Sequence, residues 1–233
     1  MKFLDTTELP FAEKYRFLIF MHPKWTPQSA WTKHIPFAFF LIAVMKPKMV
    51  VELGTFLGAS FFAFCQAVKE FNLDTQCYAV DCWEGDKHAG NYSDNVYHTV
   101  VAAHSHYKEF AYLLRMDFEE AAKLNELKKI DLLHIDGLHT YEAVKHDFET
   151  WLPKMSDEGV IIFHDTAEMK DDFGVWRLWD ELSAQYPSAS FAHGHGLGIL
   201  LVGNKVKKEL RRFVSDKHFD GYEHLFQVVG CSI

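Results

Sequence analysis

The sequence contains few cysteines, and none of them form a recognisable pair. The four thiols belong to Cys65, Cys77, Cys82 and Cys231, and no two of them have CxxC spacing. The usual patterns of zinc fingers and dithiol redox sites are therefore absent. A chain of 233 residues is also long enough to bury its own core without a disulfide framework. We expect reduced thiols and a cytoplasmic protein.

Long apolar runs and basic clusters are missing as well. The longest apolar stretch, residues 37–45, is about half of the roughly 20 residues that a membrane-spanning helix requires, so it predicts a buried helix. The first residues lack the apolar core of a signal peptide, and we expect no membrane insertion. The net charge is −8 and no run is rich in lysine or arginine, so nucleic acid is not an expected partner.

From residue 49 onward, short apolar runs alternate with helical segments. The predicted strands are residues 49–53, 77–80, 112–116, 130–135 and 159–163, and the predicted helices are residues 59–71, 94–109, 118–127, 141–152 and 173–185. This alternation predicts right-handed βαβ units and a parallel sheet covered on both faces. Two last runs, around Phe191 and at residues 198–202, are too close for a helical crossover and predict an antiparallel hairpin.

No flexible linker, internal repeat or low-complexity segment divides the chain. The segment before residue 47 has a mainly helical pattern that is interrupted by four prolines. We therefore predict a helical N-terminal extension over residues 1–46 and one α/β domain over residues 47–233.

The loop after the first strand lacks the usual nucleotide fingerprints. Counted from Gly54, a dinucleotide pattern needs glycines where the chain has Phe56 and Ala59, and no lysine follows Gly58 as in a phosphate loop. What remains is Glu-x-Gly-x-x-x-Gly, with Asp81 at the end of the next strand. An acidic side chain there can accept hydrogen bonds from the ribose hydroxyls of an adenosine. The alternative interpretation is a turn with a purely structural role.

Residues 51–60 resemble the first motif of class I methyltransferases that use S-adenosylmethionine (SAM), with Phe56 in place of the middle glycine. Residues 130–141, 151–153 and 163–166 resemble one subfamily, the methyltransferase domain 24 type, which is similar to small-molecule and sugar O-methyltransferases. The resemblance implies a Rossmann-like α/β fold with a mostly parallel seven-stranded sheet, a C-terminal antiparallel hairpin and flanking helices. It also implies SAM as cofactor. The predicted cofactor-binding residues are Glu52, Gly54, Thr55, Gly58, Ser60, Asp81, Trp83, Asp117 and Phe118.

Acidic residues end two neighbouring strands. Asp136 follows the fourth strand and Asp165 the fifth, and adjacent strands are about 4.8 Å apart, so both carboxylates are expected at one lip of the sheet. With His164 they form an oxygen and nitrogen cluster that can hold a divalent metal such as Mg²⁺ or Mn²⁺. A cluster without metal is the alternative. The resemblance implies that His139 is the general base and that Asp136 belongs to the catalytic set.

Several other polar residues have two interpretations. The loop after the second strand carries Asp86 and His88, which we interpret as a lid that contacts substrate, with a structural loop as the alternative. His134, inside a strand, is expected to be a hydrogen-bonded structural histidine. Asp131 and Asp147 are expected to be solvated or capping residues.

Two histidine-containing segments remain. His193 and His195 flank a glycine in the predicted hairpin turn, where a glycine turn with incidental histidines is favoured over a metal site. Trp31, His34 and Phe37 either cover the acceptor pocket or form an interface in a homo-oligomer.

We therefore predict a SAM-dependent methyltransferase that acts on a hydroxyl of a sugar or another small polar acceptor. The first alternative is a metal-free enzyme that methylates nitrogen or carboxylate. A second is a non-catalytic scaffold of the same fold, associated with polysaccharide synthesis. An iron-dependent oxygenase on this fold ranks last.

Overall fold

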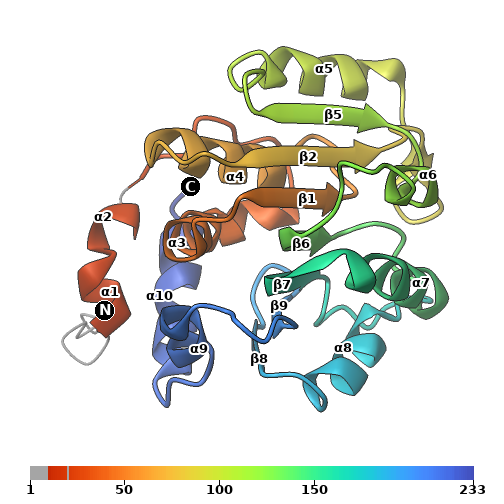
Figure 1. The fold of residues 1–233 in the computed structure, drawn as a ribbon. Coiled ribbons are helices and arrows are strands. Elements are labelled where there is room, and N and C mark those ends of the chain that lie inside the picture. Colours follow the sequence, from red (N-terminus) through yellow and green to blue (C-terminus); the bar gives the residue numbers. More distant parts are fainter. Residues whose placement is uncertain (1–9, 20) are drawn as a thin grey trace.

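Seven strands form one sheet in the order β5–β2–β1–β6–β7–β9–β8 (Figure 1). The computed structural model describes residues 10–19 and 21–233. The strands of this sheet are β1 (Met49–Leu53), β2 (Gln76–Asp81), β5 (Ala111–Arg115), β6 (Ile130–Ile135), β7 (Met155–His164), β8 (Ser188–Phe191) and β9 (Leu197–Leu201). The first five strands in this order are parallel, whereas β9 is antiparallel to β7 and β8. The predicted fold class, including its C-terminal hairpin, is confirmed.

Helices cover both faces of the sheet. The helical elements are α1 (Pro10–Lys14), α2 (Arg16–Ile19), η2 (Ala30–His34), α3 (Ile35–Met45), α4 (Ala59–Glu70), α5 (Asp94–His104), α6 (Phe118–Ala122), α7 (Tyr141–Trp151), η3 (Leu152–Lys154), α8 (Val175–Ser183), α9 (Lys208–Val214) and α10 (Phe219–Gly230). Strand residues alternate between two buried clusters: Val50 packs with α3, α4, α5, α9 and α10, and its neighbour Val51 packs with α6, α7 and α8. The strands are apolar on both faces because both faces are covered.

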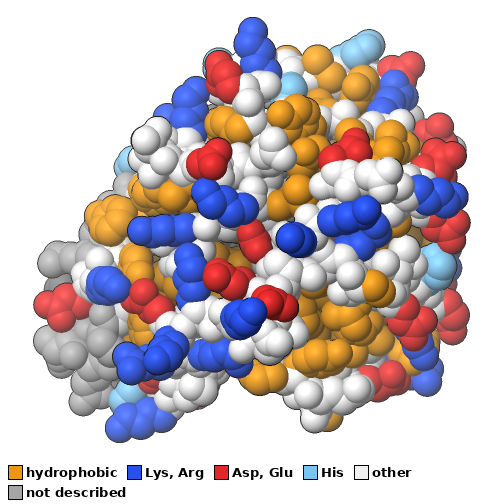
Figure 2. Space-filling view, in the orientation of Figure 1, with side chains coloured by type: hydrophobic (Ala, Val, Ile, Leu, Met, Phe, Trp, Pro, Cys, Tyr) orange, Lys and Arg blue, Asp and Glu red, His pale blue; other side chains and the backbone are white. Residues whose placement is uncertain are grey.

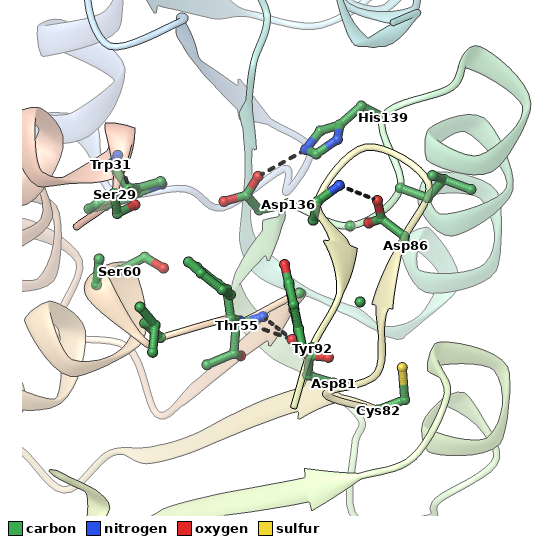
Figure 3. Close-up of a pocket in the computed structure, with 18 of the residues that line it drawn as sticks. Ser29, Trp31, Thr55, Ser60, Asp81, Cys82, Asp86, Tyr92, Asp136 and His139 are labelled. Carbon is green, nitrogen blue, oxygen red and sulfur yellow. Dashed lines mark hydrogen bonds and ion pairs between the residues drawn. The ribbon is translucent and has the colours of Figure 1, made fainter. Parts of the chain in front are cut away.

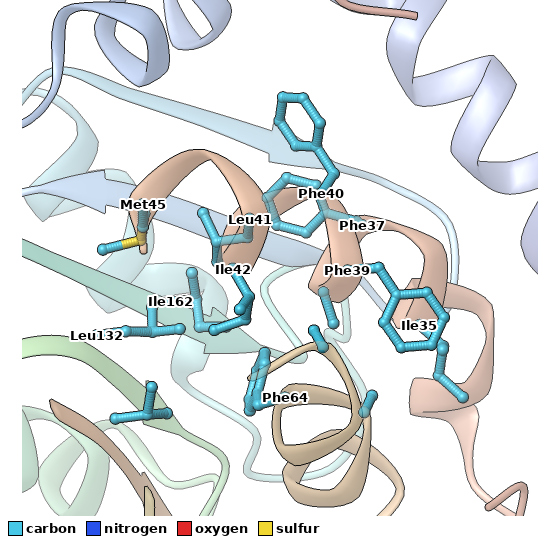
Figure 4. Packing of buried hydrophobic residues seen from close by; sticks show 14 of the residues in the cluster. Ile35, Phe37, Phe39, Phe40, Leu41, Ile42, Met45, Phe64, Leu132 and Ile162 are labelled. Atoms are coloured by element: carbon cyan, nitrogen blue, oxygen red, sulfur yellow. The ribbon is translucent and has the colours of Figure 1, made fainter. Parts of the chain in front are cut away.

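The apolar run at residues 37–45 lies within α3, which is buried on nearly all sides as predicted. Pro36 fits the first turn, where its missing N–H would have no partner within the helix. Figure 4 shows Phe37, Phe39 and Phe40 on this helix, near Phe64 of α4. Helix α3 therefore belongs to the same buried cluster as the sheet, and the division of the chain at residue 47 remains a prediction.

The structure corrects several sequence-based boundaries. Helix α6 ends at Ala122 rather than Leu127. The backbone N–H of Lys123 donates to the carbonyl of Glu120, three residues earlier, so the α-helical pattern of bonds four residues apart stops there. The predicted lid loop contains a small hairpin of β3 (Gly85–Asp86) and β4 (Gly90–Asn91). Helices α9 and α10 were not predicted, and they pack on α3 from the far end of the chain. The first nine residues of the predicted extension lie outside the described residues.

The distribution of surface charge and the length of the helices are both consistent with the amino-acid composition. On the face drawn in Figure 2, lysine and arginine side chains are interspersed with acidic ones. In residues 10–19 and 21–233, no helix has the length and apolarity needed to cross a bilayer.

Candidate active site

A cavity of about 640 Å³ opens at the carboxyl ends of the central strands. Its walls come from the loop after β1, the end of β2, the β3–β4 hairpin, the start of α6, the turn after β6 and the N-terminal segment around η2 (Figure 3). Open α/β sheets bind ligands at this end, where the strand order reverses. Of the predicted cofactor residues, six line the cavity: Gly54, Thr55, Ser60, Asp81, Asp117 and Phe118.

The conformation of the loop after β1 explains why residue 54 is a glycine and shows how Phe56 replaces the glycine of the usual motif. Gly54 has φ of 86°, and a Cβ on it would lie 2.1 Å from the backbone oxygen of Asp136, so no larger residue fits. Phe56, at the position of the missing middle glycine, has φ of 47°. It thus adopts the left-handed backbone that glycine would adopt more easily, and its ring packs against Tyr92 with the ring centroids 4.8 Å apart.

The Asp81 carboxylate organises this wall of the cavity. Its Oδ2 accepts hydrogen bonds from the backbone N–H groups of Thr55 at 2.8 Å and Phe56 at 2.9 Å. Its Oδ1 accepts one from the N–H of Trp83 at 2.6 Å. Asp81 therefore joins the loop after β1 to the loop after β2, and it still lines the cavity.

Three predicted cofactor residues lie behind the wall instead: Glu52, Gly58 and Trp83 are absent from the cavity lining. Gly58 precedes the first turn of α4 in a left-handed conformation. Trp83 is 1% exposed, and its indole N–H donates to the carbonyl of Phe56. Sequence reasoning placed these residues at the right strand ends but could not tell which side chains turn inward.

Glu52 belongs to a buried hydrogen-bonded chain. The indole Nε1 of Trp31 can only donate, and it lies 3.1 Å from Nε2 of His134. The His134 Nδ1–H therefore donates to Oε2 of Glu52, at 2.8 Å. Burial raises the pKa of Glu52, and His134 only partly offsets this. His134 is thus a structural histidine, as expected, and it ties the N-terminal segment to β1 beneath the cavity.

The hydrogen bonds from Trp31 through His134 to Glu52 also fix where the N-terminal aromatic residues lie. Trp31 is 1% exposed yet lines the cavity, and Phe37 is fully buried between the sheet and α10. His34 is buried as well. Of the two interpretations left open by the sequence, covering the pocket fits Trp31, and none of these side chains is available to an interface.

The two strand-end carboxylates meet as predicted, and His139 joins them. His139 Nε2 lies 3.0 Å from Oδ2 of Asp165 and 3.6 Å from Oδ1 of Asp136. One ligand atom from each of these three residues falls within 4.8 Å of the other two. Asp136 and His139 line the cavity, so the cluster borders the space where an acceptor would lie.

His164 approaches the same carboxylates from another side. Its Nε2 is 2.9 Å from the carbonyl oxygen of Gly194, which can only accept, so Nε2 carries a hydrogen. Its Nδ1 then faces Oδ1 of Asp136 at 3.4 Å and Oδ2 of Asp165 at 3.3 Å. The turn that contains His193 thus supports His164 through a backbone carbonyl, in keeping with the structural interpretation of that turn.

In this cluster, burial and the neighbouring charges shift the pKa values in opposite directions. Burial alone would lower the pKa of His139, but Asp136 and Asp165 outweigh it and raise that pKa to about 9. The same two carboxylates outweigh burial at His164 and raise its pKa to about 10. For Asp165, burial is outweighed by the two histidines, and its pKa falls to about 2. The cluster therefore holds negative carboxylates and two positively charged imidazoles.

The β3–β4 hairpin reaches over His139. His88, at its tip, lies 2.6 Å from Oδ1 of Asp172, which Lys87 also contacts. The Phe173 ring stacks on His139 with centroids 4.7 Å apart and an interplanar angle of 1°, and it also contacts His88. The hairpin is thus fastened over the cluster, where the sequence suggested a lid. Amide exchange in this hairpin would measure how often it opens.

Of the two acidic residues expected to be solvated or capping, one differs from its predicted environment. Asp147, expected to be solvated or capping, is 8% exposed on α7, and burial raises its pKa to about 7. Periodicity did not reveal this, because one polar residue on the buried side of an amphipathic helix looks like any other. Asp131 does act as a cap, since its Oδ2 accepts from the N–H of Lys48 at 2.6 Å and Met49 at 3.3 Å.

Comparison with known families identifies the domain. Residues 51–166 match the family model described as a methyltransferase domain. The chain carries a class I, SAM-dependent methyltransferase domain. The matched segment runs from β1 to the residue after Asp165, so it contains both the cavity walls and the carboxylate cluster.

Two curated relatives are longer than this chain. An uncharacterized protein of Sinorhizobium fredii is 48% identical over 184 residues, which are 79% of this chain and 20% of that protein. An uncharacterized protein of Acanthamoeba polyphaga mimivirus is 31% identical over 126 residues, which are 52% of each. The chain thus spans about a fifth and about half of the lengths of the relatives it matches.

Solved methyltransferase structures share the fold. The O-methyltransferase TomG of Streptomyces achromogenes, in complex with SAM, superimposes with a TM-score of 0.55 at 14% identity, covering 83% of this chain and 88% of its own. An O-methyltransferase of Bacillus cereus, in complex with S-adenosylhomocysteine (SAH), also has a TM-score of 0.55 at 14% identity, with coverages of 84% and 90%. At these identities the likeness concerns the fold alone.

Proposed function

We propose that this methyltransferase transfers a methyl group from SAM to a hydroxyl oxygen of a small polar acceptor such as a sugar. The observation that carries the proposal is His139, whose ring nitrogen borders the cavity and lies between the carboxylates of Asp165 and Asp136. A hydroxyl is a poor nucleophile until its proton is removed, and His139 can accept that proton once its own ring is neutral. The ring is neutral above a pH of about 9, or at lower pH when a bound cation offsets the two carboxylates that raise its pKa.

The cavity fits SAM in its donor chemistry. Asp81 ends β2 with its carboxylate at the cavity, where the ribose hydroxyls of the cofactor would donate to it. Asp117 and Phe118 form another wall, and an aromatic ring beside a polar group suits an adenine. The Thr55 side chain is buried beside Glu52, whose pKa it helps to lower, and its backbone N–H is bonded to Asp81. SAM supplies an electrophilic methyl group, and the protein supplies alignment of the attacking oxygen with it.

The carboxylate cluster also fits a divalent cation. The carboxylates of Asp136 and Asp165 lie close enough together to share one cation, and Nδ1 of His164 lies 3.4 Å and 3.3 Å from them. Carboxylate oxygens suit Mg²⁺ or Mn²⁺, and the added imidazole favours Mn²⁺ of the two. The proposed ligands are Asp136, Asp165 and Nδ1 of His164, which leaves His139 as the base. When bound, such a cation would acidify the acceptor hydroxyl and offset the negative charge beside His139.

The first experiment is a calorimetric titration of SAH into the wild-type protein and the Asp81→Asn variant. The variant replaces a charged acceptor of three backbone N–H groups and of the proposed ribose bonds, so we expect affinity to fall about tenfold or more. Asp180→Asn, an exposed change of the same type on α8, serves as the control and should bind SAH normally. Absence of SAH binding to the wild type would refute the methyltransferase proposal and favour a scaffold role.

The metal assignment needs its own titration. Mn²⁺ added to the SAH-loaded protein should release or absorb heat, and Asp165→Asn should abolish that heat. His164→Gln should weaken Mn²⁺ binding, whereas His139→Gln should leave it nearly unchanged. The reverse pattern would make His139 the ligand and remove it as the base. Binding of SAH without any metal heat would favour the metal-free enzyme, which methylates nitrogen or carboxylate.

A further inference from the structure

The cavity lining carries more negative than positive charge, because its basic side chain, His139, is already paired with Asp136 and Asp165. Carboxylates reach it from four places: Asp81 at the end of β2, Asp86 in β3, Asp117 before α6 and Asp136 after β6. Among the residues that the structure describes, no lysine or arginine lines it. Sites for phosphorylated or carboxylated ligands usually contain such residues, because these side chains match the geometry and charge of the anion.

Three of these carboxylates already have partners that occupy them. Asp81 accepts three backbone N–H bonds, Asp117 caps α6 by accepting from the N–H of Glu120, and Asp136 faces His139 and His164. Their charges are therefore committed to the loops, to a helix end and to the catalytic cluster.

Asp86, like Asp117, has hydrogen bonds from the described part of the chain on only one of its two oxygens, but it lies in the β3–β4 hairpin that reaches over His139. Its Oδ1 accepts from the N–H groups of His88 at 2.7 Å and Ala89 at 2.9 Å, which fixes the side chain at the hairpin tip. Its Oδ2 accepts no hydrogen bond from the described residues. Figure 3 places Asp86 on the same side of the cavity as His139 and across from Ser60. A fixed carboxylate with one free oxygen thus lies on the side of the base.

The nearby lysines do not cancel this charge. Lys87 contacts Asp172 outside the cavity, and Lys170 lies 3.4 Å from a carboxylate oxygen of Glu168. The Tyr92 hydroxyl reports the resulting field: burial raises its pKa, and the charges of Asp81, Asp86 and Asp136 raise it further. Any second anion in the cavity would meet the same repulsion.

From these contacts we infer that the acceptor is an amine-bearing hydroxyl compound, of the amino-sugar or amino-alcohol class, whose ammonium group pairs with Asp86. This deepens the proposed function and rests on it. The ammonium donates to the free Oδ2, and the hydroxyl to be methylated then lies toward His139. The same field excludes acceptors with a phosphate or carboxylate next to that hydroxyl, including sugars bound to nucleoside diphosphates.

The test compares ligands that differ only in charge. Glucosamine, N-acetylglucosamine and glucuronate are titrated near neutral pH into the SAH-loaded protein, and dissociation constants are read from ligand-observed NMR. We expect glucosamine to bind at least about tenfold more tightly than its N-acetyl form, the usual strength of a charge-assisted hydrogen bond, and glucuronate to bind least. Asp86→Asn, which keeps an oxygen for the two backbone N–H groups, should abolish this preference without changing SAH affinity. Asp180→Asn, with the same change in net charge, should keep it.

Several outcomes would overturn the inference: equal binding of the amine and its N-acetyl form, tighter binding of glucuronate, no binding of any of the three, or a preference that survives Asp86→Asn. In each of these cases SAH still binds, and the proposed methyltransferase function stands. Failure of SAH to bind would instead refute the proposed function itself.

Discussion

Asp147 carries a carboxyl group that is buried on α7. Its Oδ2 lies beside Gly137, a cavity residue, and burial raises its pKa from the ordinary 3.8 to about 7. One pKa unit corresponds to about 1.4 kcal/mol. Keeping Asp147 ionised in the folded protein therefore costs up to about 4 kcal/mol of unfolding free energy above pH 7.

The sign of the pH dependence follows from where protons bind. Between pH values of about 4 and 7, the folded state holds a proton on Asp147 that the unfolded state has released. Stability should therefore fall as the pH rises through this window and should level off above it. Asp147→Asn removes the ionisable group, so the variant should be more stable than the wild type by about 2 to 4 kcal/mol at pH 8 and by little at pH 4.

Urea unfolding at a series of pH values measures both effects. Glu149→Gln, on an exposed position of the same helix, is the matched control and should change stability by less than about 0.5 kcal/mol at every pH. The reasoning is refuted if the wild type and Asp147→Asn show parallel pH profiles, or if the variant is the less stable protein at pH 8. Either result would mean that the folded protein stabilises the ionised carboxylate.

Two other changes test the walls of the cavity. Trp31→Phe leaves the buried Nε2 of His134 without a donor, so urea unfolding should show a loss of about 1 to 3 kcal/mol, and an unchanged midpoint would contradict the hydrogen-bonded chain. Gly54→Ala places a Cβ 2.1 Å from the backbone oxygen of Asp136 and should abolish SAH binding. Gly90→Ala has a similar positive φ with open space around it, so it should retain binding, and equal losses in both variants would show that φ alone matters.

The sequence by itself determined the fold and which strand ends carry the acidic residues that line the cavity. Apolar runs of strand length, each followed by a helix, predicted a parallel sheet with helices on both faces. Parallel strands must be joined by crossover helices, and these helices bury the apolar faces of the sheet. Acidic residues follow three of these strands, at Asp81, Asp136 and Asp165. Because the carboxyl ends of parallel strands lie at the same edge of the sheet, these residues had to lie there together. The terminal hairpin followed from a connection too short for a crossover.

Only the tertiary structure decided which side chains reach the cavity and how they are paired. Glu52 and Asp81 are both acidic residues of neighbouring strands, yet one is buried against His134 and the other lines the pocket. That difference depends on Trp31, which is far away in sequence and close in space. The environment of Asp147 is hidden from the sequence in the same way, because burial and charge depend on distances between elements that no local pattern encodes.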